Sequence, residues 1–143
     1  MCVNDEELAL LLSYAGNFLG YGCLDAAFFF VGLEEAGVQN AAQAISRAKV
    51  WNDLGHGPTL DLFDYSQRVG AGQWFVENPN LQRTWQPLIR FLLTVAPDLR
   101  ANGNQGTVTN EEIRNFQRDH WGRANSNTCL LELFGLPKAA GNA

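Results

Sequence analysis

The stretch that decides the fold is Tyr21–Gly37, YGCLDAAFFFVGLEEAG. Its apolar run, Ala26–Leu33, ends abruptly at two adjacent carboxylates, Glu34 and Glu35. A short run of this kind, rich in Phe and bounded by turn residues, is typical of a strand buried on both faces of a parallel sheet. Ligands of open parallel sheets bind in the crevice beyond the carboxyl ends of the strands. The sequence therefore predicts a site at Glu34 and Glu35.

A second buried strand is predicted near the other end of the chain, over Thr128–Phe134, TCLLELF. A turn at Gly135-Leu136-Pro137 closes it. Two parallel strands alone leave both outer edges of a sheet unpaired, so another element must complete the sheet. The candidates are a weak strand at Gln73–Val76 and a second copy of the chain. We therefore expect a homo-oligomer, and specifically a dimer.

Apolar residues recur at helical spacing in about five segments before and between the two strands. Two of these segments begin with a capping box, formed by Asn4 with Glu7 and by Thr109 with Glu112. Pro87 either begins the helix predicted over Leu81–Val95 or kinks it. The other two predicted helices cover Asn40–Leu54 and a short segment capped by Thr59. These elements predict a helix-rich α/β fold with a small parallel sheet, one domain spanning residues 1–143.

Composition and charge narrow the class of protein. With 143 residues, 46% of them hydrophobic, the chain has enough material for a core. No apolar stretch reaches the roughly 18 residues that a membrane-spanning helix needs, so we expect no membrane association. The net charge of −5 disfavours nonspecific nucleic-acid binding, which depends on dense Lys and Arg contacts to phosphates.

The cysteines and the first residues bear on location. Three cysteines, an odd number without CxxC spacing, favour a reduced cytoplasm and argue against a metal site. Asp5, Glu6 and Glu7 stand where a secretory signal would carry basic residues. We predict a cytoplasmic protein without metal or cofactor.

Several other side chains are candidates for the strand-end cleft. Glu132 lies inside an apolar strand, where a buried carboxylate needs a partner. That partner is Arg83, Arg90 or Arg118 if Glu132 is structural; otherwise Glu132 lines a pocket. Trp74 and the phenylalanines of the first strand are candidate stacking surfaces, and Asp64 and Tyr65 are candidates for the same cleft. For Glu34 and Glu35, the structural alternative is favourable negative charge at the N-terminus of the next helix.

Five motifs together resemble a family of bacterial and phage-borne proteins of unknown function, some of them placed at the edge of the uracil-DNA glycosylase-like superfamily. The motifs are YGCLDAAFFFVGLEEAG, LGHGPTLDLFDYSQRVG, LQRTWQPLIRFLL, FQRDHWGR and TCLLELFGLP, which cover the chain from about Gly20 to Pro137. The resemblance implies that Gly32–Gly37 occupies the superfamily's first strand-end motif, with Glu in place of the water-positioning Asp or Asn. It also implies that Leu131–Pro137 is the second strand and its turn.

A later His-Pro-Ser motif of the superfamily has no counterpart here, and the resemblance implies a chain that is short at its C-terminal side. Base excision also needs a donor for the departing base, and only His56 and His120 are candidates. We therefore expect a non-catalytic binding module with a polar cleft formed by Glu34, Glu35, Arg83, Trp74 and Glu132. Its ligand would be a small polar molecule or a nucleotide. The alternatives are a nucleobase glycosylase that uses Glu34 or Glu35 and a self-associating structural protein of a mobile element.

Overall fold

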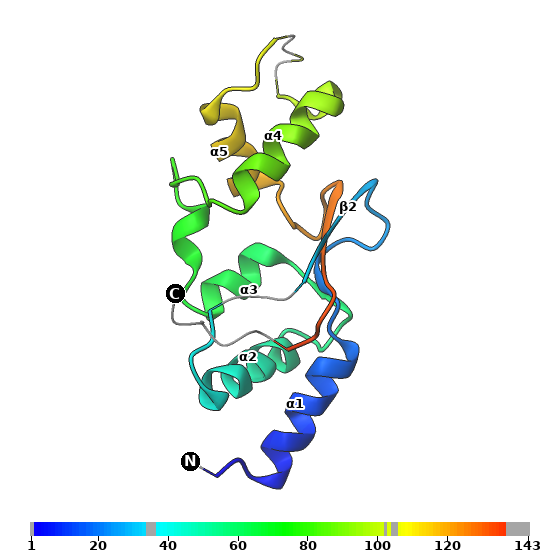
Figure 1. The fold of residues 1–143 in the computed structure, drawn as a ribbon, viewed down its shortest axis with the longest axis vertical. Coiled ribbons are helices and arrows are strands. Elements are labelled where there is room, and N and C mark those ends of the chain that lie inside the picture. The colour runs from blue at the N-terminus through cyan, green and yellow to red at the C-terminus, as the bar shows by residue number, and fades with distance from the viewer. Residues whose placement is uncertain (1, 34–36, 102, 104–105, 137–143) are drawn as a thin grey trace.

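The computed structural model of the chain describes residues 2–33, 37–101, 103 and 106–136. The α-helices are α1 (Asp5–Asn17), α2 (Ala41–Asp53), α3 (Leu62–Arg68), α4 (Trp85–Val95) and α5 (Asn110–Asp119). The strands are β1 (Gly20–Gly22), β2 (Phe28–Gly32), β3 (Thr59–Leu60) and β4 (Thr128–Glu132), and two short 3-10 helices are η1 (Gly72–Phe75) and η2 (Pro97–Leu99). The elements follow one another in the order α1-β1-β2-α2-β3-α3-η1-α4-η2-α5-β4, and the colours of Figure 1 trace the chain from its N-terminus to its C-terminus. The helix-rich α/β class predicted from the sequence is confirmed.

The four strands form one mixed sheet in the order β2-β4-β1-β3. β2 and β4 pair in parallel, from Phe28 opposite Thr128 to Gly32 opposite Glu132, which confirms the pairing expected of the two predicted strands. β1 runs antiparallel to β4 and parallel to β3, so the sheet is not purely parallel. The sheet is therefore extended within the chain itself. The segment predicted as a weak strand, Gln73–Val76, falls mostly in the 3-10 helix η1.

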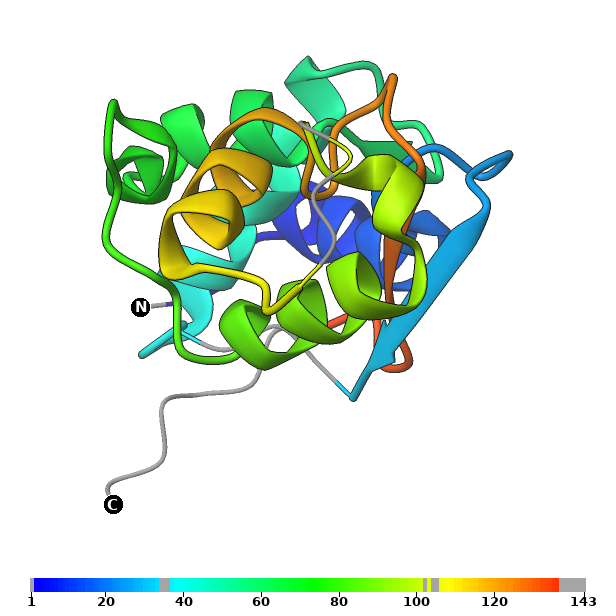
Figure 2. The same ribbon diagram turned by 90° about the horizontal axis from the view of Figure 1, so that it is seen from above.

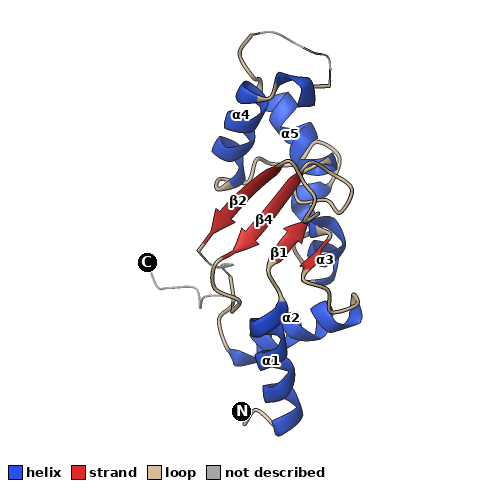
Figure 3. Cartoon of the chain, turned by 90° about the vertical axis from the view of Figure 1, so that its right-hand side faces the viewer, coloured by secondary structure: helices blue, strands red, loops and turns tan. Residues whose placement is uncertain are grey.

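The prediction that the first strand is buried on both faces is wrong. β2 lies at the edge of the sheet, and Phe29 and Val31 are exposed while Phe28 and Phe30 are half-buried against the core. Figure 3 looks onto the sheet with no helix in front of it, and Figure 2, at right angles to the view of Figure 1, shows the helices gathered on one side of β2. The sheet thus has one covered face and one open face. Among the described residues, no helix is both long and apolar enough to cross a membrane.

Two glycines let β1 approach β4 closely. Gly20 and Gly22 both have positive φ, 151° and 105°. A Cβ atom on Gly20 would lie 1.9 Å from the carbonyl oxygen of Leu130, and one on Gly22 would lie 2.3 Å from that of Thr128. Only glycine adopts this backbone at no steric cost, so β1 depends on its two glycines. The strand is also too short for hydrophobic patterning to predict it.

The helix boundaries follow the local chemistry closely. Both predicted capping boxes are present, Asn4 with Glu7 at α1 and Thr109 with Glu112 at α5. The predicted cap of α3 is wrong by two residues, because Thr59 pairs in β3 and Asp61 caps the helix. Pro87 lies in the first turn of α4, where its missing N–H costs no helical hydrogen bond.

Asp61 also fixes α3 to the segment that leads into β4. Its carboxylate accepts from the backbone N–H of Phe63 and Asp64 at 3.0 and 3.2 Å. Both carboxylate oxygens accept from Nε of Arg123 at 3.0 Å, and Oδ2 also accepts from the N–H of Ala124 at 2.9 Å. The Arg123 guanidinium lies 4.8 Å from the ring centroid of Phe63, a cation–π distance. This pairing holds α3 under the covered face of the sheet.

Candidate functional site

A cavity of about 290 Å³ opens under the covered face of the sheet, and we call it the Glu132 cavity. Glu132 is the last residue of β4, and β2 ends beside it at Gly32, so the cavity lies at the shared carboxyl end of the parallel pair. This is the edge of the sheet at which the sequence predicts a site. The lining residues come from the sheet and from the helices that pack under it: Tyr21, Arg47, Leu62, Tyr65, Ser66, Val69, Ala71, Trp74, Gln82, Thr84, Trp85, Leu130 and Glu132.

The charged side chains of the cavity are Glu132 and Arg47. A Cβ atom on Gly32 would lie 3.1 Å from Oε2 of Glu132, so the missing side chain at Gly32 leaves room for the carboxylate. Arg47 reaches the cavity from α2, and its Nη2 donates to the carbonyl of Gly37, after the end of β2, at 3.3 Å. One acceptor-only group and one donor-only group therefore line the same small space.

Aromatic rings and hydroxyl groups form the remaining walls. Tyr21 of β1 and Tyr65 of α3 are both almost fully buried, and their ring centroids lie 5.2 Å apart. Ser66, also buried, adds a third hydroxyl. On the opposite wall Trp74 and Trp85 meet edge to face at 6.4 Å. Such a lining, apolar rings with a few convergent polar groups, is typical of small-molecule sites.

A buried glutamine positions the wall that carries Trp74 and Gln82. Gln117 of α5 is fully buried, and its Nε2 donates to the carbonyls of Trp74 and Asn80 at 2.9 and 3.0 Å. Its Oε1 accepts from the backbone N–H of Gln82 at 3.0 Å. Oε1 of Gln82 in turn accepts from the N–H of Thr84 and Trp85, which caps α4. The segment between η1 and α4 is thus held in place by side-chain amides.

A smaller pocket of about 160 Å³ adjoins the Glu132 cavity and shares Thr84, Trp85, Leu130 and Glu132 with it. Phe30 and Trp121 form part of its lining, with their ring centroids 5.0 Å apart. Trp121 is fully buried, and its Nε1 has no hydrogen-bond partner among the described residues. The pocket extends the cavity along the covered face towards β2.

The structure brings together two of the five predicted ligand-binding residues. Trp74 and Glu132 line the same cavity, and so does Tyr65, whereas Asp64 does not. Arg83 is exposed on the turn before α4 and does not line the cavity; it has no hydrogen bond or ion pair with any described residue. Glu34 and Glu35, and the Pro137 turn, lie outside the described residues.

The arginines considered as partners of Glu132 are engaged elsewhere or exposed. Arg90 donates to the carbonyl of Val108 and to Asn110, both at 2.7 Å, and Arg118 pairs with its neighbour Asp119 at 2.8 Å. The histidines are also away from the cavity: His56 packs on Trp51 and His120 on Phe116.

Three contributors to this site were missed by sequence reasoning. Arg47 lies in a segment predicted as a helix, and Tyr21 lies at the border of the first predicted strand. No local pattern in the sequence therefore indicates that either residue belongs to a site. Gln117 could have been identified from the sequence, because it follows Ile113 and Phe116 on the apolar stripe of α5. A polar residue on such a stripe is expected to hold a buried hydrogen-bond network.

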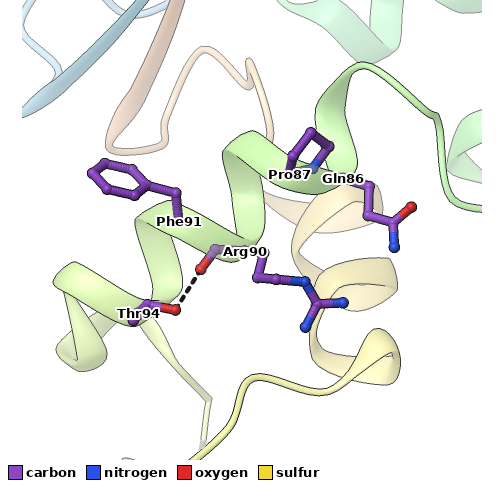
Figure 4. Close-up of a pocket in the computed structure, with 5 residues that line it drawn as sticks. All are labelled: Gln86, Pro87, Arg90, Phe91 and Thr94. Carbon is purple, nitrogen blue, oxygen red and sulfur yellow. Dashed lines mark hydrogen bonds between the residues drawn. The ribbon is translucent and has the colours of Figure 1, made fainter.

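Two other hollows are larger but less suited to a ligand. One is a strip of about 460 Å³ along the outer surface of α4, lined by Gln86, Pro87, Arg90, Phe91 and Thr94 (Figure 4). Two of the three polar side chains of this strip are used within the fold, since Thr94 Oγ1 donates to the carbonyl of Arg90 at 2.7 Å and Arg90 binds Val108 and Asn110.

The other hollow, also about 460 Å³, lies between α4 and α5. Its buried Arg100 forms two hydrogen bonds with Glu112, at 2.7 and 3.0 Å. The hydrogen bond from the Arg100 guanidinium, together with that from the Thr109 N–H, lowers the pKa of Glu112 to about 2. These charges neutralise each other, so the pair stabilises the junction of α5 with the preceding loop.

No group of three or more His, Cys, Asp or Glu side chains that would hold a metal ion occurs among the described residues. Comparison with known proteins adds no further constraint, because no family model, curated protein or solved structure matches the chain. The site therefore has to be interpreted from its own geometry.

Proposed function

We propose that the chain is a non-catalytic binding module that holds a small polar ligand in the Glu132 cavity. The observation that supports this most is the convergence of Glu132 and Arg47 with three buried hydroxyl groups and two tryptophans on one small cavity. A carboxylate and a guanidinium together favour a ligand that presents both hydrogen-bond donors and acceptors. The aromatic walls favour a flat ring between them.

The size of the cavity limits the ligand. At about 290 Å³, with a further 160 Å³ beside it, the space is at the lower end of the range of small-molecule pockets, roughly 300–1,000 Å³. A nucleobase or the base and sugar of a nucleotide matches both this size and the pattern of donors, acceptors and rings. The proposed ligand class is therefore a nucleobase, nucleoside or nucleotide.

The test is a calorimetric titration of the full chain with the free bases, nucleosides and nucleoside monophosphates. We expect at least one compound to bind, and Glu132→Gln to weaken it by about 10-fold or more, because a hydrogen bond to a charged acceptor is lost. Glu77→Gln is the matched control: Glu77 is exposed and does not line the cavity, so this variant should bind like the native chain. Equal loss in both variants, or binding by neither the native chain nor its control, would contradict the proposal.

Two alternative proposals make different predictions. A nucleobase glycosylase that acts through Glu34 or Glu35 requires base release from uracil-containing DNA, and Glu34→Gln or Glu35→Gln would abolish that release. A structural protein of a mobile element requires self-association and no effect of Glu132→Gln on any ligand titration. A cytoplasmic location remains part of the proposal, on the evidence of the sequence alone.

A further inference from the structure

The open face of the sheet carries a continuous set of apolar side chains. Alternate residues of a strand point to opposite faces, so Phe29, Val31 and Leu33 share one face with Cys129, Leu131 and Leu133 of β4 and its continuation. Cys129 is buried, whereas the exposed fractions of Phe29, Val31, Leu33 and Leu133 are 47, 66, 67 and 63%. We call Phe29, Val31, Leu33, Leu131 and Leu133 the open-face patch. None of the five is charged or polar.

The exposed area of this patch is comparable with that of the largest apolar patch on a typical monomer. If each large apolar side chain contributes on the order of 200 Å² when fully exposed, the four exposed members present roughly 500 Å² to water. That value lies within the range of about 300–600 Å² found for the largest patch on a monomer, which is often functional. A standard interface buries about 800 Å² per partner, a little more than half of it apolar, so the patch supplies the apolar share of one partner.

From these observations we infer that a second copy of the chain packs on the open-face patch, sheet against sheet, about a two-fold axis. A two-fold interface uses the same patch on both copies, and an uncharged patch allows this although each chain carries a net charge of −5. Packing of the two open faces would place the helices of both copies outside, in four layers. Pairing of the two β2 edges would leave most of the patch in water, so the patch favours face packing.

This interface lies on the face of the sheet opposite to the Glu132 cavity, and it shares only Val31 and Leu131 with the smaller pocket beside that cavity. The open-face patch and the Glu132 cavity lie on opposite faces of the sheet, since Leu130 and Glu132 alternate with Leu131 and Leu133 along β4 and its continuation. Association can therefore be tested without a ligand, and failure of one proposal leaves the other in place.

The test is the solution mass of the full chain by size-exclusion chromatography with light scattering over a range of concentrations. We expect twice the 15.8 kDa mass of the chain, and we expect Val31→Lys to raise the dissociation constant about 30-fold or more. Leu133→Lys should do the same, because it introduces a charge on the same face from the neighbouring strand. Val76→Lys is the matched control: Val76 is 51% exposed and follows η1, whose Trp74 lines the cavity on the covered side of the sheet, so its variant should remain a dimer.

Each contrary outcome is distinct. A native chain that stays monomeric at every concentration would overturn the inference, as would dissociation by Val76→Lys alone. Dissociation by Val31→Lys with an intact Leu133→Lys dimer would indicate β2 edge pairing and would overturn face packing. Circular dichroism of each variant separates loss of association from loss of folding, and two variants on two strands keep the test decisive if one of them does not fold.

Discussion

The two faces of the sheet carry similar apolar side chains and differ in what covers them. The covered face takes Phe28, Phe30 and Leu130 into the aromatic core, whereas the open face leaves Phe29 and Val31 in water. All five side chains are large and apolar, and four of them are consecutive in the sequence. Apolar content therefore does not by itself indicate burial on both sides of a strand; the packing of the helices decides which side is buried.

The two faces also differ in chemistry. The covered face ends in a cavity where Glu132 meets buried hydroxyl groups, while the open face is uncharged over the patch. We assign ligand binding to the first and self-association to the second. Substitutions on β1 and β2 test how sharply the two faces differ, and an ion pair remote from the sheet provides a reference.

Gly22→Ala should destabilise the chain by about 4 kcal/mol or more, enough to unfold a small domain. The new Cβ would lie 2.3 Å from the carbonyl oxygen of Thr128, and a φ of 105° is strained for any residue with a side chain. Urea denaturation measures the change. Gly16→Ala on α1 is the control: its Cβ meets nothing within 4 Å, so it should stabilise the chain by about 0.5–1 kcal/mol. A loss below about 1 kcal/mol for Gly22→Ala would show that β1 does not approach β4 as described.

Two neighbouring phenylalanines compare the faces directly. Phe30→Ala should cost about 3 kcal/mol, because the Phe30 ring packs on Trp121 with centroids 5.0 Å apart. Phe29→Ala should cost less than about 1 kcal/mol, because nearly half of Phe29 is already exposed. Both are measured by urea denaturation in the Val31→Lys background, which keeps the open face free of a second copy. Equal costs would mean that β2 has no preferred face.

The ion pair of α5 lies apart from both faces of the sheet and provides a reference for overall stability. The pKa of Glu112 is lowered from 4.5 to about 2 by its hydrogen bonds from Arg100 and Thr109. A lowered carboxyl pKa stabilises the folded state above the unfolded value, so this contribution is complete above about pH 4.5 and is lost as the pH falls towards 2. At 1.36 kcal/mol per pKa unit, a lowering of about 2.5 units corresponds to at most about 3.4 kcal/mol for this side chain, which is 19% exposed.

Free energies of unfolding at pH 7 and pH 3, for the native chain and for Glu112→Gln, measure this contribution. The variant should be less stable at pH 7 and should lose less stability on acidification. A variant whose pH dependence matches that of the native chain would contradict the assigned pKa.

Much of the fold could be predicted because its signals are local. The capping boxes at Asn4 and Thr109 depend on residues three positions apart, and the two strands that form the parallel pair are long apolar runs. β1 and β3 could not be predicted, because strands of three and two residues exist only through pairing with distant segments. The edge position of β2 is likewise a property of the whole sheet.

The candidate site was predicted less completely than the fold. The position of the cavity at the strand ends was predicted from the sequence. Trp74 and Glu132, which line it, were also predicted, because each is an unusual residue in its local context. Arg47 was not predicted, because its helix is packed beside the cavity only in the folded chain. The prediction of Arg83 is not supported by its exposed position on the turn before α4.

The central claim, that β2 is an edge strand with one covered and one open face, is tested most directly by residue-resolved amide hydrogen exchange along Phe28–Gly32. The N–H of Phe28 donates to Asn127 and the carbonyl of Gly32 accepts from Leu133, so alternate residues, Phe28, Phe30 and Gly32, face β4. We predict slow exchange at these three amides and fast exchange at Phe29 and Val31 in the native chain. In Val31→Lys we predict the same rates at the four residues of the strand that are unchanged. Uniformly slow exchange along the strand would contradict the account, because it would mean that another strand pairs with this edge.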